Sequence, residues 1–518
     1  MELEKKIIKR IHEKGKAFSQ ITLDDDYIIK DNKPDAIKIV HTQGKIVFEE
    51  SKAASQAVWI NGKLEFAVLY RSDDEFNKLE VLTGAIPFQE KVAVDGITEL
   101  DPIKLRADIE DLSAGLINSR KLAIRAVVNL TVQAEETVEE QIASGLINPE
   151  GYELKQTERQ MLKLLTAKKD VVRIRNEIRL PNAKPNIRKI LWYTIDIRNV
   201  ESSPENGKMH MQGEAYVAVI YRSEEEEQMQ WLETTMPFSG DVDCDETESP
   251  DLYWVRVEPQ NLEIELQNDY DGESRVLGAD LSFEVDLKLW KEEQVRILED
   301  VYALDREVIP HREKGLTPCL RMKNVAKVRI GDQFRLESNQ EKILQICCYQ
   351  GHIHIDKTIV AENGVAFEGV LHVHILYFTA DDNFPIAHLE EVLPFEQVVE
   401  VNHISENTWY EYDASVDMLQ VNLLDNAEYE IKAGLRLSVL AFDENCTEKI
   451  TELEEAPLDV NQLVNQPGIV GYIVQENEEL WDISKKYHTT MEEIAGINSL
   501  KSSKIKPGNK LIIVKRVV

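Results

Sequence analysis

The chain has 518 residues, 43% of them hydrophobic, and a formal net charge of −34. This length exceeds one hydrophobic core and predicts roughly three or four domains, while the apolar content is too high for global disorder. The acidic excess excludes general nucleic-acid binding, because a phosphate backbone would be repelled.

The N-terminal stretch MELEKKIIKRIHEKGKAF mixes charged and apolar residues throughout. It lacks the continuous apolar core of a signal peptide, and no later segment approaches the roughly 18 apolar residues of a membrane span. We therefore expect the protein to stay in the cytosol of the cell that makes it.

Three stretches led by a glycine match one another: GKLEFAVLYRS from Gly62, GEAYVAVIYRS from Gly213 and GVLHVHILYFT from Gly369. A tyrosine follows each glycine after eight residues, and the proline of IPF, MPF or LPF follows that tyrosine after 17, 16 or 17 residues. Upstream, KPDAIKI and KPNIRKI correspond in the first two copies, whereas the third has NQEKILQI. The glycines are 151 and 156 residues apart, so the period describes whole domains rather than a solenoid. We infer three tandem copies.

Even offsets from each glycine are apolar, which predicts a strand with one face in a core. In the first copy these residues are Leu64, Phe66, Val68 and Tyr70. The odd offsets mix charged and small apolar residues, so we expect the second face to be partly solvated or covered by a loop. Similar strands near the end of each copy favour a twisted antiparallel sandwich or barrel-like sheet.

The stretches that follow the first and third copies are charged. TVEEQIASGLINPEGYELKQTERQMLKLLTAKK carries Leu162, Leu164 and Leu165 at near-helical spacing, and we interpret it as a helical connector. The acidic stretch after the third copy contains Pro457 and Pro467 and predicts a tether.

The predicted fold is mainly β, with three tandem β-sandwich-like domains, helical connectors and a small C-terminal βααβ domain. The expected boundaries are 1–148 for the first β domain, 149–312 for the connector and second β domain, 313–445 for the third, 446–468 for an acidic linker and 469–518 for the C-terminal module.

The sequence nominates no catalytic residue and no cofactor. It has no phosphate-binding loop, nucleophile elbow, H-E-x-x-H or dinucleotide-binding glycine motif, so we expect a protein that is not an enzyme.

The cysteines are odd in number, form no C-x-x-C pair and are expected to be buried thiols. They are Cys244, Cys319, Cys347, Cys348 and Cys446.

Two H-x-H pairs occur in the third copy, His352 with His354 and His372 with His374. Residues two apart on a strand face the same side, so adjacent strands could present up to four imidazoles to one metal. The alternative is a set of polar, partly exposed strand residues, and we expect no metal site because no carboxylate or thiol stands at a helpful spacing. The acidic runs LDDDY and SEEEEQ lack the pattern of a calcium loop and are expected to be solvated turns.

The segment from Ile469 to the end predicts a strand, two helices and a closing strand within about 50 residues. Its apolar residues alternate at first and then change to helical spacing. The expected core consists of Tyr472, Val474, Leu480, Ile483, Ile494, Leu511 and Ile513.

Two resemblances follow from these motifs. The glycine-to-tyrosine strand followed by [IML]-P-F is similar to the SPOCS domain, a module of spore-coat-associated proteins in endospore-forming bacteria, over roughly residues 20–445. The pattern Y-x-V-x5-L-W-x-I-x3-Y, with TTMEEIAGIN and IKPGNKLII, resembles LysM, a module usually associated with N-acetylglucosamine polymers such as peptidoglycan.

Glycan-binding LysM members typically have G-D-T or G-D-S before the first helix, where this chain has Asn477, Glu478 and Glu479. Two carboxylates at the rim of a sugar groove do not favour an uncharged acetamide. We therefore expect a protein partner on the two loops beside the first helix. The candidate partner-binding residues are Asn477, Glu478, Glu479, Leu480, Trp481, Ile505, Lys506, Pro507 and Gly508.

Three SPOCS-like domains followed by one LysM-like domain resemble the SipL-like spore coat morphogenetic proteins. The resemblance implies a scaffold in the mother-cell cytoplasm that the LysM-like domain recruits to the coat ATPase SpoIVA at the forespore surface. Other coat proteins are further implied partners, without nucleic acid or membrane insertion. The alternative is a cell-wall or cortex protein that binds peptidoglycan through the same domain. Residues 469–518 carry eight basic and six acidic side chains, so a near-neutral module on an acidic body favours docking to a protein.

Overall fold

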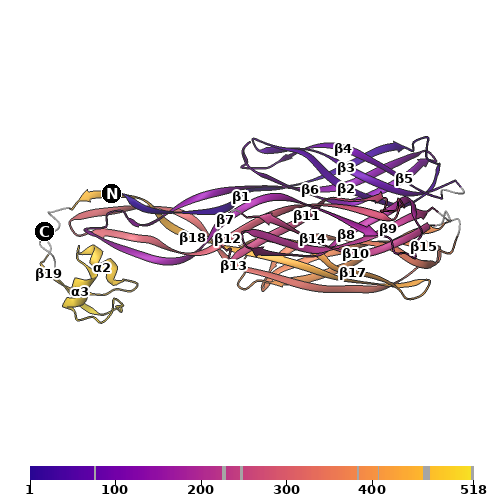
Figure 1. Ribbon diagram of the computed structural model, residues 1–518. Helices are drawn as coiled ribbons and strands as arrows, with labels where there is room; N and C mark the ends of the chain where they lie inside the picture. The colour runs from indigo at the N-terminus through magenta and orange to yellow at the C-terminus, as the bar shows by residue number, and fades with distance from the viewer. Residues whose placement is uncertain are drawn as a thin grey trace.

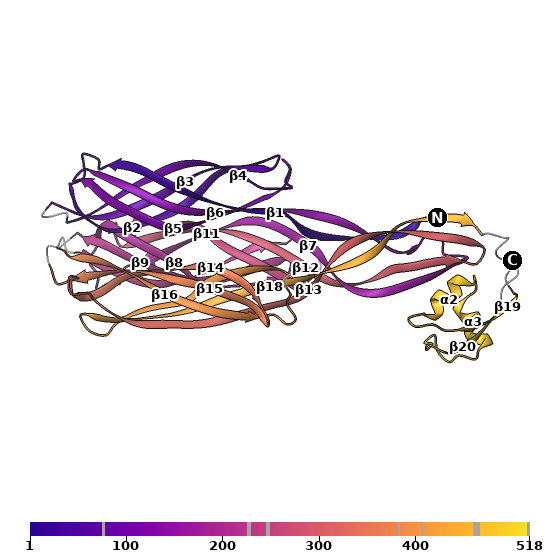
Figure 2. The ribbon, with the colours of Figure 1, turned by 180° about the vertical axis from the view of Figure 1, so that it is seen from behind.

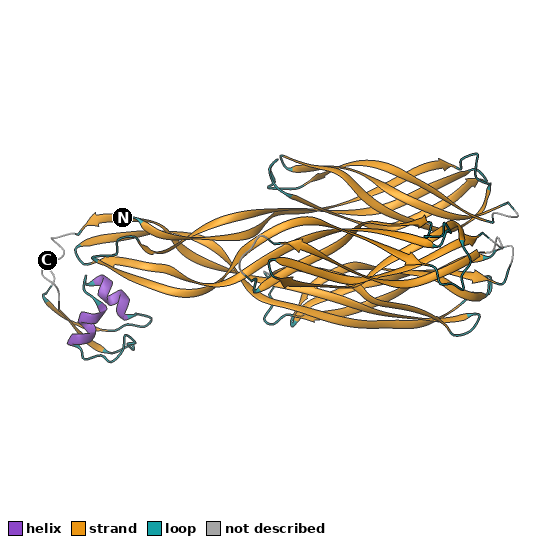
Figure 3. Cartoon of the chain, in the orientation of Figure 1, coloured by secondary structure: helices purple, strands orange, loops and turns teal. Residues whose placement is uncertain are grey.

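The computed structural model describes residues 1–74, 78–224, 229–244, 249–381, 384–405, 408–458 and 467–514, without the side chains of 315–321 and 443–447. Strands dominate it, and the helices of the described residues are confined to the C-terminal module (Figure 3). The mainly β fold class is therefore confirmed.

Each copy folds into two three-stranded antiparallel sheets that enclose a core. The sheet orders are β1-β6-β5 with β2-β3-β4, β11-β12-β7 with β10-β9-β8, and β13-β18-β17 with β14-β15-β16. The first copy contains β1 (Leu3–Ile28), β2 (Ala36–Ala54), β3 (Ala57–Ser72), β4 (Leu79–Ala93), β5 (Ile103–Asn118) and β6 (Lys121–Leu146). The second contains β7 (Tyr152–Arg179), β8 (Ile187–Glu205), β9 (Lys208–Ser223), β10 (Met229–Asp243), β11 (Leu252–Gln267) and β12 (Val276–Ala303). The third contains β13 (Arg306–Arg335), β14 (Ile343–Ala361), β15 (Gly364–Thr379), β16 (Ile386–Glu400), β17 (Trp409–Leu423) and β18 (Glu428–Pro457).

The tyrosine of the repeated motif occupies the same place in all three copies. Tyr70, Tyr221 and Tyr377 lie on the middle strands β3, β9 and β15, and all three are fully buried. Each hydroxyl donates to a backbone carbonyl 36 residues earlier in the chain. The acceptors are Pro34 at 3.3 Å, Pro185 at 3.3 Å and Glu341 at 3.0 Å. The tyrosine thus bonds the middle strand to the backbone just before the first strand of the same sheet. The apolar face predicted for the middle strand is confirmed.

The motif glycine lies opposite the motif phenylalanine on the neighbouring strand. The pairs are Gly62 with Phe88, Gly213 with Phe238 and Gly369 with Phe395. A Cβ atom at Gly213 would lie 2.6 Å from the ring of Phe238 and 3.2 Å from the carbonyl oxygen of Arg198. The ring covers the glycine so closely that a side chain there would displace it.

The three sandwiches, which we call the head, lie side by side (Figures 1 and 2) and share a second core. The ring of Tyr216 in the second copy stacks on that of Tyr349 in the third, with centroids 5.0 Å apart. Sister copies therefore cover the apolar residues on the second face of each middle strand, where a loop was the other expected cover. The polar residues of that face, Lys63, Glu65, Glu214 and His372, remain partly or fully exposed, so the expected partial solvation is confirmed. The shared core contains Leu69, Leu79, Leu191, Trp192, Tyr216, Ala218, Ile220, Cys347, Cys348, Leu376 and Ile386.

The outer strands of 26–30 residues extend beyond the head as a stalk. The stalk consists of three twisted two-stranded ribbons, 3–13 with 135–146, 152–163 with 291–303, and 306–319 with 443–457 (Figure 1). Side chains from all three copies fill its centre. They include Ala143, Leu146, Leu298, Val301, Ala303, Val308, Ile450 and Leu453.

The prediction of a helical connector is wrong, because most of its residues belong to β6 and β7, with a short turn at 147–151 between them. Leu162 and Leu164 are both 3% exposed and point inward with the period of a strand. The ladder between β12 and β7 steps from Thr166 to Leu164, so Leu165 is the extra residue of a β-bulge. This extra residue gives the three leucines the spacing that resembles one face of a helix.

The predicted linker at 446–468 is also partly wrong, because β18 continues to Pro457. Residues 459–466 of that range lie outside the described part of the chain. At the other end, β13 already begins at Arg306, before the predicted boundary at 313. The third copy is longer than predicted because its outer strands also build the stalk.

The structure also tests the predictions for the cysteines and for the acidic runs, as far as these residues are described. Cys244, Cys347 and Cys348 are buried as expected, whereas the side chains of Cys319 and Cys446 lie outside the described set. The LDDDY run is not a turn: it lies in β1, where Asp24 forms an ion pair with Arg125 of β6 and Asp26 with Lys121. Most of the SEEEEQ run, 225–228, lies outside the described residues.

Among the described helices, none has the length and hydropathy needed to cross a membrane.

The C-terminal module has the predicted βααβ order. Its elements are β19 (Ile469–Ile473), α2 (Leu480–Lys486), α3 (Met491–Ile497) and β20 (Lys510–Val514). Six of the seven predicted core residues are buried, and Tyr472 packs against them while partly exposed. The module lies at the end of the stalk that is remote from the head (Figures 1 and 2).

Candidate protein-binding site

The C-terminal module contacts the stalk through α2 and the turn that follows it. The Trp481 indole nitrogen donates to Asp300 Oδ2 at 2.8 Å, and Lys485 Nζ lies 2.7 Å from Asp300 Oδ1. The Trp481 ring packs edge-on against Tyr302, with centroids 4.8 Å apart. The Tyr302 hydroxyl donates to the Thr489 carbonyl at 2.9 Å. One end of β12 therefore holds the module through one carboxylate and one phenol.

Asp300 is the electrostatic centre of this contact. Burial acts to raise its pKa, but the hydrogen bonds from Lys485 and Trp481 outweigh burial and lower the pKa below the ordinary aspartate value. The ionised carboxylate therefore has favourable partners in the folded protein, and hydrogen bonds to a charged group are the stronger kind.

We predict that Asp300→Ala releases α2 from the stalk. Removing an ionised acceptor costs about 1.5–3 kcal/mol, so amide hydrogen exchange at residues 480–489 should quicken by roughly tenfold or more. Asp305→Ala is the matched control, because Asp305 pairs with its exposed neighbour Arg306 and not with the module. Unchanged exchange in Asp300→Ala would show that this carboxylate does not hold the module.

The pH dependence of the contact follows from the lowered pKa of Asp300. The pKa of Asp300 is lower in the folded protein than in the unfolded chain, where it is about 3.9. The ionised carboxylate therefore stabilises the contact at pH values above about 3.9, and this stabilisation is lost as the pH falls through the folded pKa. The wild type and Asp300→Ala should therefore differ at neutral pH and become alike in strong acid.

The predicted loop residues separate into two groups. Asn477, Lys506, Pro507 and Gly508 are exposed at the tips of two loops. The loops are neighbours as expected, because the amide of Gly508 donates to the carbonyl of Val474 at 2.9 Å. This group is available to a partner.

The other predicted loop residues have partners within the chain. Leu480 and Ile505 pack in the module core, and Trp481 is covered by the stalk. Glu478 accepts hydrogen bonds from the Tyr472 hydroxyl at 2.6 Å and from the Gln475 amide at 2.8 Å. Glu479 forms an ion pair with Lys155 of the stalk at 2.7 Å. The two carboxylates that replace the sugar-binding loop thus stabilise the module and its position on the stalk.

Sequence reasoning missed an exposed apolar surface on the sheet of β19 and β20. We call it the outer sheet face, and it consists of Ile469, Ile473, Ile512 and Val514, with exposed fractions of 67%, 54%, 51% and 39%. Alternate residues of a strand point to opposite faces, and Val470, Tyr472 and Val474 take the inner one. The sequence itself indicates this surface, because apolar residues occupy positions on both faces of the two strands and not only on the face that packs in the core. Gathered apolar side chains on a small surface are typical of a protein interaction site.

The two H-x-H pairs do not form one four-imidazole site. His352 and His354 both turn to Asp108 of the first copy, with nitrogen to oxygen distances of 2.8 and 2.5 Å. His372 and His374 lie on the adjacent strand, and the nearest carboxylate to His372 is that of Glu390 at 3.7 Å. The pairs separate because β14 packs against the first copy, which the spacing within one copy could not reveal.

Comparison with known protein families finds four matching segments. Residues 35–117, 186–267 and 342–424 match the SPOCS domain of SipL, and residues 472–514 match the LysM domain. Each SPOCS segment spans the four strands from β2 to β5 or their equivalents, so the long strands of the stalk lie outside it. No curated protein and no solved structure matches the chain.

Proposed function

Because the chain carries three SPOCS domains and a LysM domain, we propose that it is a non-enzymatic scaffold of spore coat assembly. In this proposal the LysM domain docks onto the coat ATPase SpoIVA at the forespore surface, from the mother-cell cytoplasm. The observation that carries the proposal is the outer sheet face, an exposed apolar surface on the module that the stalk holds farthest from the head.

The arrangement of the head supports a scaffold. Three domains that share a core and continue into one stalk keep a constant distance between the LysM domain and the head. A partner held at the stalk end leaves the sandwiches free to contact other coat proteins. The net charge of −34 on the chain opposes self-association, which keeps the scaffold available to its partners.

The contacts of the LysM domain favour a protein over a glycan. Trp481 does not offer its ring to a sugar, because it is 4% exposed and packs on Tyr302. Glu478 and Glu479 occupy the loop that lines the sugar groove in glycan-binding members of the family, and each is already paired within the chain. The alternative function, binding of peptidoglycan or N-acetylglucosamine polymers, would require this loop to reorganise.

The test compares both ligands with the full chain. We expect the protein to be retained by immobilised SpoIVA and to remain in the supernatant when purified peptidoglycan sacculi are sedimented. Retention by sacculi and not by SpoIVA would overturn the proposal in favour of the cell-wall alternative.

A further inference from the structure

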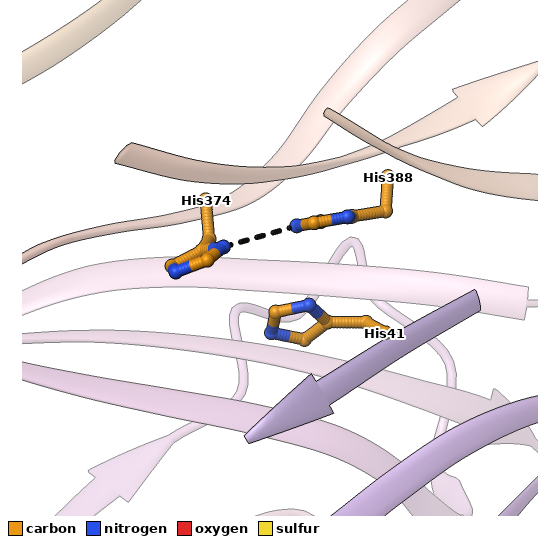
Figure 4. Close-up of side chains that lie close together, drawn as sticks. All are labelled: His41, His374 and His388. Atoms are coloured by element: carbon orange, nitrogen blue, oxygen red, sulfur yellow. Dashed lines mark hydrogen bonds between the residues drawn. The ribbon is translucent and has the colours of Figure 1, made fainter. Parts of the chain in front are cut away.

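Three histidines from the first and third copies meet where the sandwiches join (Figure 4). His41 lies on β2, His374 on β15 and His388 on β16. His374 Nδ1 lies 3.2 Å from His388 Nε2, and the rings of His41 and His388 have centroids 4.3 Å apart. One ring nitrogen from each histidine lies within 4.8 Å of the other two. We call these residues the histidine triad.

Within the described residues, the ring nitrogens of the histidine triad form no ion pair with a carboxylate. The ring of His41 is 7% exposed and packs against Trp192 of the second copy, with centroids 5.3 Å apart. Within the described residues its two nitrogens have no hydrogen-bond partner, and the hydrogen bond of His374 to His388 joins one triad member to another. Burial lowers the pKa of His388 to about 3 and that of His41 well below 6.5, so both rings are neutral at pH 7. Neutral imidazole is the form that binds a metal.

The histidine triad has a route for solvent and ions. His41 and His374 line an open central cavity of about 2520 Å³, which is bounded by all three copies. A small ion can therefore reach the triad, and a water molecule from the cavity can complete its coordination.

We propose that the histidine triad binds one Zn²⁺ ion, with a water molecule as the fourth ligand. Tetrahedral zinc with Zn–N bonds of about 2.0–2.1 Å places its nitrogen ligands roughly 3.3 Å apart. The separation between His374 and His388 already fits this value. The ring of His41 completes the site by moving about 1.5 Å closer, the difference between the 4.8 Å limit and the roughly 3.3 Å that tetrahedral zinc requires. Imidazole ligands without thiolates suit zinc among the abundant divalent metals. The bound ion links the first copy to the third at the level of the shared core.

The test uses the full chain without a histidine tag, stripped by a chelator and dialysed against micromolar Zn²⁺. Elemental analysis should find about one zinc per chain, and the metal should raise the melting temperature because it binds the folded state. His374→Gln and His388→Gln should each lower zinc affinity at least tenfold. His352→Gln is the matched control, since His352 lies on the same cavity wall and pairs with Asp108 outside the triad.

Wild-type protein without stoichiometric zinc would overturn the proposal, whatever the variants do. Equal zinc binding by the wild type and both triad variants would also overturn it, as would a loss in His352→Gln as large as that in His374→Gln. Melting of the metal-free variants is measured in parallel, and His41→Gln supplies a third triad position if one of the two does not fold. The site is separate from the LysM domain, so its failure would leave the proposed docking function untouched.

Discussion

Replacing Lys288 with alanine should destabilise the head by about 3–5 kcal/mol, the cost of breaking a buried ion pair by removing one partner. Lys288 lies on β12 of the second copy and is 1% exposed. Its ammonium group bonds to Glu135 of the first copy at 3.0 Å and to Glu411 of the third. Burial acts to lower the pKa of Lys288, but the two carboxylates outweigh burial and raise it, so the lysine is charged. Without it, Glu411 loses its buried ion-pair partner and Glu135 is left with Lys104, which lies 3.0 Å away.

The measurement is urea unfolding followed by circular dichroism. Lys9→Ala is the matched control, because Lys9 and Glu139 form an exposed ion pair between strands of the first copy and such pairs contribute about 0–1 kcal/mol. The combined change of Lys288→Met, Glu135→Gln and Glu411→Gln should recover part of the loss, since no buried charge is left unpaired. A loss no larger for Lys288→Ala than for Lys9→Ala would show that this ion triad does not join the three copies.

Ile512→Arg should weaken binding to SpoIVA by about 30-fold or more, which corresponds to the 2 kcal/mol of an interface hot spot. Ile512 is 51% exposed near the middle of the outer sheet face and lies opposite Gly471, so the free protein tolerates a longer side chain there. In the complex the guanidinium would be removed from water without a partner.

The binding assay is biolayer interferometry of the full chain on immobilised SpoIVA. Ile117→Arg makes the same chemical change at an isoleucine of equal exposure, 51%, on β5 of the head, and should bind like the wild type. If Ile512→Arg keeps wild-type affinity, the partner does not use the outer sheet face. If both variants lose affinity together, the effect is one of added charge and not of the LysM surface.

Sequence patterns within one domain predicted the local structure well. The glycine, tyrosine and proline of the repeat mark the middle strand of each sandwich because its contacts, such as that from Tyr221 to Pro185, close within 36 residues. The LysM core was predictable for the same reason, since its apolar spacing over about 50 residues is complete in itself.

Contacts between copies could not be predicted in the same way. The stalk strands are far longer than the usual five or six residues. The bulge at Leu165 also interrupts the alternation of inward and outward residues by which a strand is recognised. Trp481 finds its acceptor Asp300 at a separation of 181 residues, and Asp108 meets His352 at a separation of 244. No pattern of local spacing encodes such pairs. The histidine triad was not predictable either, because His41 comes from the first copy whereas His374 and His388 come from the third.

Site-specific photo-crosslinking tests directly whether the outer sheet face docks onto SpoIVA. The full chain would carry a photoreactive amino acid in place of Ile473, or in place of Ile117 as a control on the head, and would be irradiated with SpoIVA and with peptidoglycan sacculi. We predict a crosslink to SpoIVA from position 473, none from position 117 and none to sacculi. A crosslink to sacculi from position 473, or crosslinks to SpoIVA from position 117 alone, would contradict the account.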